Sequence, residues 1–209
     1  GLTESGGPGC LNLGMNNLHK LGSVGRPAPG WMAKVVDEKG EEITEGEPGE
    51  LLVKGPHMMR CYYKDEGATK SALVDGWLHT GDIARRDSDG FYYIVDRKKD
   101  IIISGGENIY PVQIEEFLRE YKGVKDVAVF GVCHCRLGEV VVALVELNPG
   151  ETCTEEELLD FCQSLPKYKR PRKIIFGKVP RNPTGKIEKY KLRKKYTAEN
   201  LNIVECSKG

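Results

Sequence analysis

Five consecutive charged residues, from Asp96 to Asp100, separate two apolar runs in the middle of the chain. The first run, Phe91–Val95, is β-like, and the second, Ile101–Ile103, is followed by Ser104-Gly105-Gly106-Glu107. A connector whose side chains all prefer water makes a poor core but a good hinge. We therefore expect two parts, residues 1–96 and 101–209, joined by a hinge at residues 97–100.

The first part has the pattern of a β-rich unit. Residues 31–36 and 50–54 are apolar or alternate, and turn-forming residues separate them at 37–40 and 47–49. Asp87-Ser88-Asp89-Gly90 marks a further hairpin turn before the apolar run. Residues 22–95 are therefore predicted to be mostly antiparallel β.

The second part mixes helical and strand patterns. Pro111 is expected to start a helix, and Thr154 with Glu157 forms the signature of a capping box at the start of a helix over 155–165. Further elements are expected as strands at 124–132, 140–147 and 172–176 and as a basic helix at 189–196. The predicted fold class is α+β: a β-rich end of a large domain, a charged hinge, and a compact α+β domain.

Composition excludes several classes of protein. The chain has no run of 18 apolar residues and no secretory signal pattern, so no membrane span is expected. Its seven cysteines, an odd number without a disulfide framework, indicate a reducing compartment, and we expect a cytoplasmic protein. Cys133-His134-Cys135 is spaced too tightly for a zinc loop, which favours a cluster at a strand end.

Charge is distributed unevenly although the whole chain is neutral. Residues 166–195 hold thirteen Lys and Arg and one acid, a net +12, so the remainder carries −12. Such a block attracts polyanions. Apolar residues and prolines interrupt it, which indicates a folded basic face and favours a small phosphorylated ligand over nucleic acid.

Two short motifs could carry chemistry. Thr80-Gly81-Asp82 places a carboxylate on a glycine-bent backbone, suited to binding a vicinal diol such as a ribose. Residues 181–187 read Arg-Asn-Pro-Thr-Gly-Lys-Ile, a loop that presents Lys186 at its tip. A lysine ammonium can bridge a carboxylate and a phosphate. Each motif alone could equally be a surface turn.

Together with the charged run, these motifs resemble the adenylate-forming (AMP-binding) superfamily, and most closely its acyl- and aryl-CoA ligases. Gly1-Leu2-Thr3-Glu4 resembles a motif inside the large N-terminal domain of that family. The resemblance implies that residues 1–96 are the C-terminal portion of the adenylation domain and 101–209 the small mobile domain. The family's phosphate loop is not found in these residues. We therefore expect them to need the rest of the N-terminal domain as a partner and to form no acyl-adenylate alone.

The resemblance also implies roles for individual residues. Thr3, Asp82 and Arg97 match nucleotide-binding positions, and Glu4 matches the carboxylate for Mg²⁺, an ion that shares oxygen ligands with substrate phosphates. We expect Thr3 and Glu4 to be disordered at the chain end. Lys186 matches the catalytic lysine, where one positioned cation contributes roughly 10²–10³-fold.

Coenzyme A and hinge positions follow from the same resemblance. Lys99 matches the pivot, where backbone rotation rather than charge would matter. Six residues match positions that contact coenzyme A: Gly105, Gly106, Glu107, Tyr168, Arg170 and Arg172. Glycines let the backbone approach the pantetheine arm, and an aromatic with cations suits its nucleotide.

The implied function is that of an ATP-dependent carboxylate–CoA ligase, with a small carboxylic acid, ATP, Mg²⁺ and coenzyme A as ligands, in fatty acid metabolism. One alternative is an amino-acid adenylation domain of a peptide synthetase, which usually continues into a carrier domain that is not found here. Another is a non-catalytic nucleic-acid-binding module that uses the basic block. Salt-dependent binding to any duplex would identify the latter.

Overall fold

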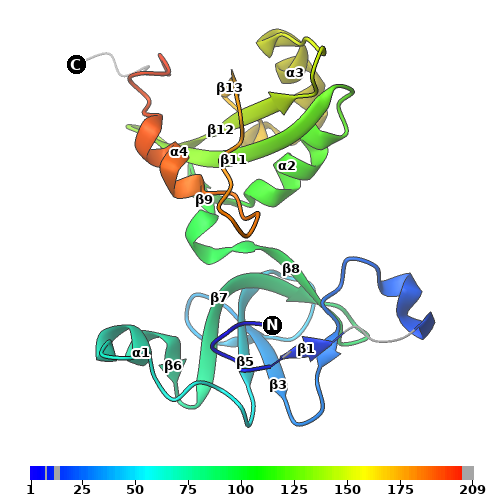
Figure 1. Cartoon of the computed structure of the whole chain (residues 1–209), viewed down its shortest axis with the longest axis vertical. Coiled ribbons are helices and arrows are strands. Elements are labelled where there is room, and N and C mark those ends of the chain that lie inside the picture. The colour runs from blue at the N-terminus through cyan, green and yellow to red at the C-terminus, as the bar shows by residue number, and fades with distance from the viewer. Residues whose placement is uncertain (8, 12–14, 204–209) are drawn as a thin grey trace. The chain divides into compact units, whose positions relative to one another are not determined.

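The structure is a computed structural model that describes residues 1–7, 9–11 and 15–203. It divides into two compact units, Gly1–Lys99 and Asp100–Gly209 (Figure 1). The boundary between the units falls inside the charged run. Each unit has its own sheet and its own hydrophobic core. The expected α+β class is confirmed.

The first unit is built on a six-stranded antiparallel sheet. Its order is β4-β3-β5-β7-β6, and β8 pairs with β7. The strands are β3 (Met32–Val36), β4 (Glu42–Ile43), β5 (Gly49–Lys54), β6 (Leu73–Val74), β7 (Trp77–Arg86) and β8 (Tyr92–Arg97). A separate pair, β1 (Cys10–Leu11) with β2 (Arg26–Pro27), and a 3-10 helix at Met15–Lys20 complete the unit. The predicted antiparallel β character of residues 22–95 is thus confirmed.

One helix of this unit was missed by the sequence analysis. Helix α1 (Glu66–Ala72) starts where the Asp65 side chain accepts a hydrogen bond from the Ala68 amide at 2.9 Å. None of its residues is buried. Without an apolar face it has no helical periodicity to detect, so only the N-cap signal was available.

The charged run does not behave uniformly. Strand β8 continues through Asp96 and Arg97, and Asp96 is only 4% exposed. The expectation that every side chain of this run lies in water is therefore wrong for Asp96. Only Lys98–Asp100, a single 3-10 turn, lie outside the strands on either side. Pairing of β8 with β7 carries the strand into the charged run.

The second unit is a five-stranded mixed sheet with helices on both faces. Its order is β10-β9-β12-β11, and β13 runs parallel to β12. The strands are β9 (Ile102–Ser104), β10 (Glu107–Ile109), β11 (Val124–His134), β12 (Gly138–Leu147) and β13 (Lys173–Phe176). The helices are α2 (Pro111–Arg119), α3 (Glu155–Phe161) and α4 (Lys189–Lys195), with 3-10 turns at Cys162–Ser164 and Lys167–Lys169.

Alternating side chains of β11 and β12 supply two cores, one on each face of the sheet. Val127, Val129 and Val141 pack with α2 and α3, whereas Phe130 and Val142 pack on the other face with residues of α4. The predicted burial of the second strand on both faces is confirmed. The capping box of α3 is present with both of its hydrogen bonds.

No helix among the described residues is long and apolar enough to cross a membrane. Within the same residues, no cluster of three or more His, Cys, Asp or Glu side chains could hold a metal ion. In the part of the chain that the structure describes, five cysteines carry free thiols: Cys10, Cys61, Cys133, Cys153 and Cys162.

Candidate functional site

Two of the predicted nucleotide-binding residues meet on neighbouring strands of the first unit. Asp82 of β7 lies directly opposite Arg97 of β8, and Arg97 Nη1 donates to Asp82 Oδ1 at 2.8 Å. Gly81, at φ +68°, and the buried Thr80, whose hydroxyl accepts from the Asp82 amide, shape the backbone before the carboxylate. The pair places an acceptor carboxylate beside a donor guanidinium, the two kinds of group that can bind a diol.

A small cavity of about 110 Å³ lies beside Asp82, and Thr80, Leu2 and Ser5 are also among its lining residues, whereas Arg97 is not. Leu2 and Ser5 belong to the turn that also carries Thr3 and Glu4, two further predicted site residues. That turn is closed by a hydrogen bond from the Ser5 amide to the Leu2 carbonyl at 3.2 Å. The cavity therefore brings Asp82 and this turn to one place.

The turn at Thr3 and Glu4 is ordered, so the expectation of disorder is wrong. Glu4 Oε1 accepts a hydrogen bond from the Tyr62 hydroxyl at 2.9 Å, and the Glu4 carbonyl accepts from the Met59 amide at 2.8 Å. The first of these bonds raises the pKa of Tyr62. These contacts from residues 59–62 hold the Glu4 carboxylate in place.

A charged network that the sequence analysis did not find lies next to the charged run. Glu50 of β5 is 8% exposed, and its Oε2 contacts Lys98 Nζ at 2.8 Å and His79 Nδ1 at 3.2 Å. Burial raises the pKa of Glu50, but the hydrogen bonds from Lys98 and His79 outweigh it, so the pKa lies below its ordinary value of 4.5. In the sequence, the only indication of this network was a charged residue, Glu50, at the beginning of an apolar strand.

We expect Glu50→Gln to lower the free energy of unfolding by about 1–2 kcal/mol at neutral pH, because the negative charge is lost and one of the two acceptor oxygens becomes an NH2 donor. Since the pKa of Glu50 is lowered by folding, its contribution is present above pH 4.5 and is lost as pH falls through the lower folded value. Urea unfolding of the wild type and of Glu50→Gln, measured from neutral pH down into acid, tests this expectation. A difference that persists unchanged in strong acid would contradict the assignment.

Lys99 lies between two anchored neighbours. Lys98 is tied to Glu50 within the first unit, and Asp100 is tied to Arg193 of α4 within the second unit at 3.0 Å. Arg193 also donates to the Asp100 carbonyl at 3.3 Å. Lys99 itself is exposed and has no ion-pair partner among the described residues. Of these three residues, it is the one whose backbone is least restrained by side-chain contacts.

The predicted catalytic lysine is presented by an ordered loop of the second unit. The Asn182 side chain accepts from the amides of Thr184 and Lys186 at 3.1 and 2.9 Å, and the Gly185 amide donates to the Asn182 carbonyl at 2.9 Å. Gly185 has φ +83°, which a side chain would strain. The exposed Lys186 side chain has no ion-pair partner among the residues that the structure describes. Its ammonium is thus available to a ligand.

Residues far apart in the chain form a second pocket, of about 370 Å³, within the second unit. Five of the six residues predicted to contact coenzyme A line it: Gly105, Glu107, Tyr168, Arg170 and Arg172. The β9–β10 hairpin forms one wall and the segment that leads into β13 forms another. Tyr168 is 45% exposed, and Lys169 Nζ lies over its ring at 5.6 Å from the centroid, so an aromatic ring and a cation stand together at this wall.

The cations that line this pocket differ in whether their side chains already have partners within the protein. The Arg170 guanidinium donates to the Leu165 carbonyl at 2.8 Å and to the Gln163 carbonyl at 2.6 Å, so it braces its own loop. Lys167 also lines the pocket, was missed by the sequence analysis, and has no ion-pair partner among the described residues. Lys167 and Arg172 are therefore the better placed cations for a phosphate.

The geometry of a tight turn explains why glycines occupy positions 105 and 106. They form the two-residue turn between the paired Ser104 and Glu107, with φ of +60° and +89°, conformations that a hairpin turn of this kind requires. A Cβ on Gly106 would meet nothing within 4 Å, and Gly106 is not among the pocket's lining residues. The turn explains both glycines without a ligand.

The basic block is partly neutralised by the fold. Five of its cations pair with acids: Lys173 with Glu155, Arg181 with Asp126, Lys189 with Glu115, Lys191 with Glu188, and Arg193 with Asp100. Four of those acids come from outside the block. Its effective charge toward a polyanion is therefore well below the +12 of the sequence, which weakens the case for nucleic acid.

Comparison with known proteins agrees with this arrangement. Residues 1–63 match the family described as AMP-binding enzyme, and residues 113–186 match the AMP-binding enzyme C-terminal domain. The chain is 42% identical over 201 residues to the long-chain-fatty-acid–CoA ligase FadD13 of Mycobacterium tuberculosis, covering 94% of this chain and 39% of the relative. It is also 42% identical over 195 residues to the 2-succinylbenzoate–CoA ligase of Bacillus cytotoxicus, covering 92% and 40%.

Solved structures show the same likeness. The o-succinylbenzoate CoA synthetase of Bacillus subtilis, in complex with its acyl-adenylate intermediate OSB-AMP, matches with a TM-score of 0.84 and 35% identity, over 92% of this chain and 40% of that one. ATP-bound MatB from Rhodopseudomonas palustris matches with a TM-score of 0.80 and 40% identity, over 84% and 36%. The chain spans about two fifths of the length of the curated relatives described above. It belongs to the AMP-binding, adenylate-forming enzyme family, and residues 113–186 correspond to the C-terminal domain of that family.

Proposed function

We propose that the complete protein containing this chain is a cytoplasmic ATP-dependent carboxylate–CoA ligase. In the first half-reaction a carboxylate oxygen attacks the α-phosphorus of ATP, and pyrophosphate leaves with the electron pair of the broken P–O bond. In the second, the coenzyme A sulfur attacks the acyl carbon, the thiol proton is lost, and AMP leaves. Relatives with both long-chain and aryl acid substrates in their names support a carboxylic acid substrate without selecting one.

The observation that carries the proposal is the pocket that Glu107, Tyr168 and Arg172 line in the second unit. It combines an exposed aromatic ring, open cations and a carboxylate at the edge of a hairpin turn. The ring suits an adenine, Lys167 and Arg172 suit phosphates, and Glu107 can accept an amide N–H of the pantetheine arm. This set of groups matches the chemistry of coenzyme A.

The first unit supplies groups for the nucleotide. Asp82 and Arg97, already paired, would hold the ribose hydroxyls, and Thr3 would donate to a phosphate oxygen. Glu4 would contribute one carboxylate to Mg²⁺, which supplies charge neutralisation for the phosphates. Its Oε1 is held by Tyr62, which orients the group without removing its charge.

Lys186 and the hairpin at residues 104–107 belong to the same unit but would serve different half-reactions. Lys186 would bridge the carboxylate and the α-phosphate in the first, and the 104–107 turn would approach the pantetheine arm in the second. Rotation at Lys99 would exchange them. Anchoring of Lys98 by Glu50 and of Asp100 by Arg193 supports a pivot at this residue.

We expect this chain to bind coenzyme A through the pocket, and Arg172→Ala to weaken that binding about 10-fold, because a charge-assisted phosphate contact is lost. Isothermal titration calorimetry with coenzyme A at two salt concentrations measures it. Lys178→Ala is the matched control, since Lys178 is an exposed cation of the same basic block that does not line the pocket. Equal weakening by both variants would place coenzyme A elsewhere on the basic block.

The same titration with a DNA duplex separates the proposal from a nucleic-acid module. Binding that is selective for coenzyme A over the duplex, and that weakens less steeply with salt than binding to a polyanionic duplex would, supports the ligase. Tight, steeply salt-dependent binding to any duplex, without binding of coenzyme A, would contradict it. In the complete protein, pyrophosphate release across acyl and aryl acids identifies the acid.

A further inference from the structure

The loop that carries Lys186 is fastened at its start by a side chain from a distant strand. Arg181 Nε donates to Asp126 Oδ2 at 2.8 Å, and Arg181 Nη2 lies 2.7 Å from the same carboxylate. The third nitrogen of the fork, Nη1, donates to the Gly185 carbonyl on the opposite side of the loop. The Arg181 guanidinium thus joins strand β11 to both arms of the loop. Because the guanidinium is planar and its N–H groups point in fixed directions, these contacts also fix the orientation of the loop.

Several groups besides Arg181 hold the Asp126 carboxylate, which lies where the register of β11 against β12 shifts, between Val124 and Asp126. Arg119 of α2 lies 3.6 Å from Asp126, and the Val127 amide donates to it at 2.9 Å. The Asp126 side chain is 16% exposed and is therefore held on several sides.

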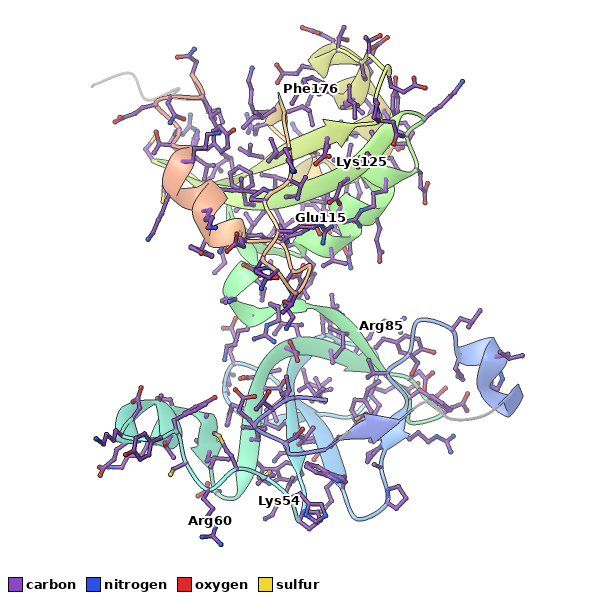
Figure 2. All side chains as sticks on the ribbon, in the orientation of Figure 1. Lys54, Arg60, Arg85, Glu115, Lys125 and Phe176 are labelled. Atoms are coloured by element: carbon purple, nitrogen blue, oxygen red, sulfur yellow. The ribbon has the colours of Figure 1, made fainter. Side chains whose placement is uncertain are left out.

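A second ion pair fastens the far end of the loop. Lys189, the first residue of α4, lies 2.8 Å from Glu115 of α2, and both side chains are less than 10% exposed. Glu115 Oε1 also accepts the Val129 amide of the sheet at 2.8 Å (Glu115 and, on β11, Lys125 are labelled in Figure 2). The loop between them is closed by pairing of Arg181 with Ile187. Lys186 therefore lies on a segment fixed at both ends.

We propose that Asp126 is a positioning residue: through Arg181 it holds the 181–187 loop in the geometry that presents Lys186 to the reacting groups. The proposal rests on the role of Lys186 given above. A flexible lysine needs a rigid base, because misplacement by about 1 Å can cost about 100-fold in rate. Asp126 itself touches no substrate in this account.

The first test uses this chain and does not depend on activity. In Asp126→Asn we expect the amides of Gly185, Lys186 and Glu188, which all donate within the loop region, to exchange with deuterium about 10-fold faster than in the wild type. Arg181→Lys, which keeps the charge but loses the fork, should do the same, and Asp126→Glu should restore protection. Glu155→Gln is the control, because Glu155 also binds a lysine and a backbone amide but lies on α3.

The second test uses the complete protein and compares half-reactions by single turnover. Asp126→Asn should slow adenylation about 10–100-fold and leave thioester formation from supplied acyl-adenylate unchanged, and Asp126→Glu should recover most of the loss. Unchanged exchange, or fast exchange with unchanged adenylation, would overturn the proposal. If the wild type forms no adenylate, the proposed function fails, and the exchange data still decide whether Asp126 holds the loop.

Discussion

Lys186→Ala in the complete protein should lower the rate of acyl-adenylate formation by about 10²–10³-fold, because one preorganised cation facing developing charge contributes this much. Thioester formation from supplied acyl-adenylate should be largely spared. The expectation follows from the geometry of the loop: the exposed ammonium projects from a segment whose backbone is held by Asn182 and Gly185. Single-turnover measurement of each half-reaction checks it.

The matched control is Lys194→Ala, which removes an exposed lysine of α4 outside the loop. It should leave both half-reactions within about twofold of the wild type, since isolated surface charges contribute little. Equal losses in both half-reactions for Lys186→Ala would contradict the two-arrangement scheme. Binding of ATP without loss in the variant would place the effect in the chemical step.

Lys99→Pro should have the opposite effect, sparing adenylation and slowing thioester formation by at least about 10-fold. Proline fixes φ near −65° and so hinders rotation concentrated at this residue, while no proposed catalytic side chain is removed. The neighbours cannot easily take over, because Lys98 is bound to Glu50 and Asp100 to Arg193. Rapid-quench measurement of acyl-CoA formation from pre-formed acyl-adenylate tests the expectation.

Lys99→Ala separates backbone freedom from charge. It should behave like the wild type in both half-reactions, because the Lys99 side chain is exposed. If alanine is as damaging as proline, charge matters and the hinge argument fails. If the proline variant completes the second half-reaction at the wild-type rate, the pivot lies elsewhere in residues 96–100.

Some elements could be predicted from the sequence because they depend only on residues close together in the chain. The Thr154–Glu157 capping box depends only on residues three apart, and the Asp87–Gly90 turn is closed by its own hydrogen bonds. Apolar runs longer than a turn marked β11 and β12. Helix α1 could not be found in this way, because it buries no residue and so leaves no periodic pattern.

Among the candidate site residues, too, some could be identified from local sequence and others only from the folded structure. Lys186 was identifiable because Pro183 and Gly185 mark its loop within a few residues. Arg170 was matched to a coenzyme A position by the family resemblance, but its contacts with Gln163 and Leu165 could not be read from the sequence, since they exist only once the segment folds back on itself. Lys167 became a candidate only when the pocket showed that it lies with residues of the 104–107 turn, which is distant in the chain.

By itself the sequence determined the local elements, the family resemblance and the chemical types available to each site, because these depend on neighbouring residues and on motifs. Tertiary structure alone decided which charges are available. Asp126 and Arg181 are 55 residues apart in the chain, and the Arg193–Asp100 pair spans 93. Folding brings such partners within hydrogen-bond distance and converts part of a basic run into internal ion pairs, leaving Lys186, Lys167 and Arg172 as open cations at the candidate sites.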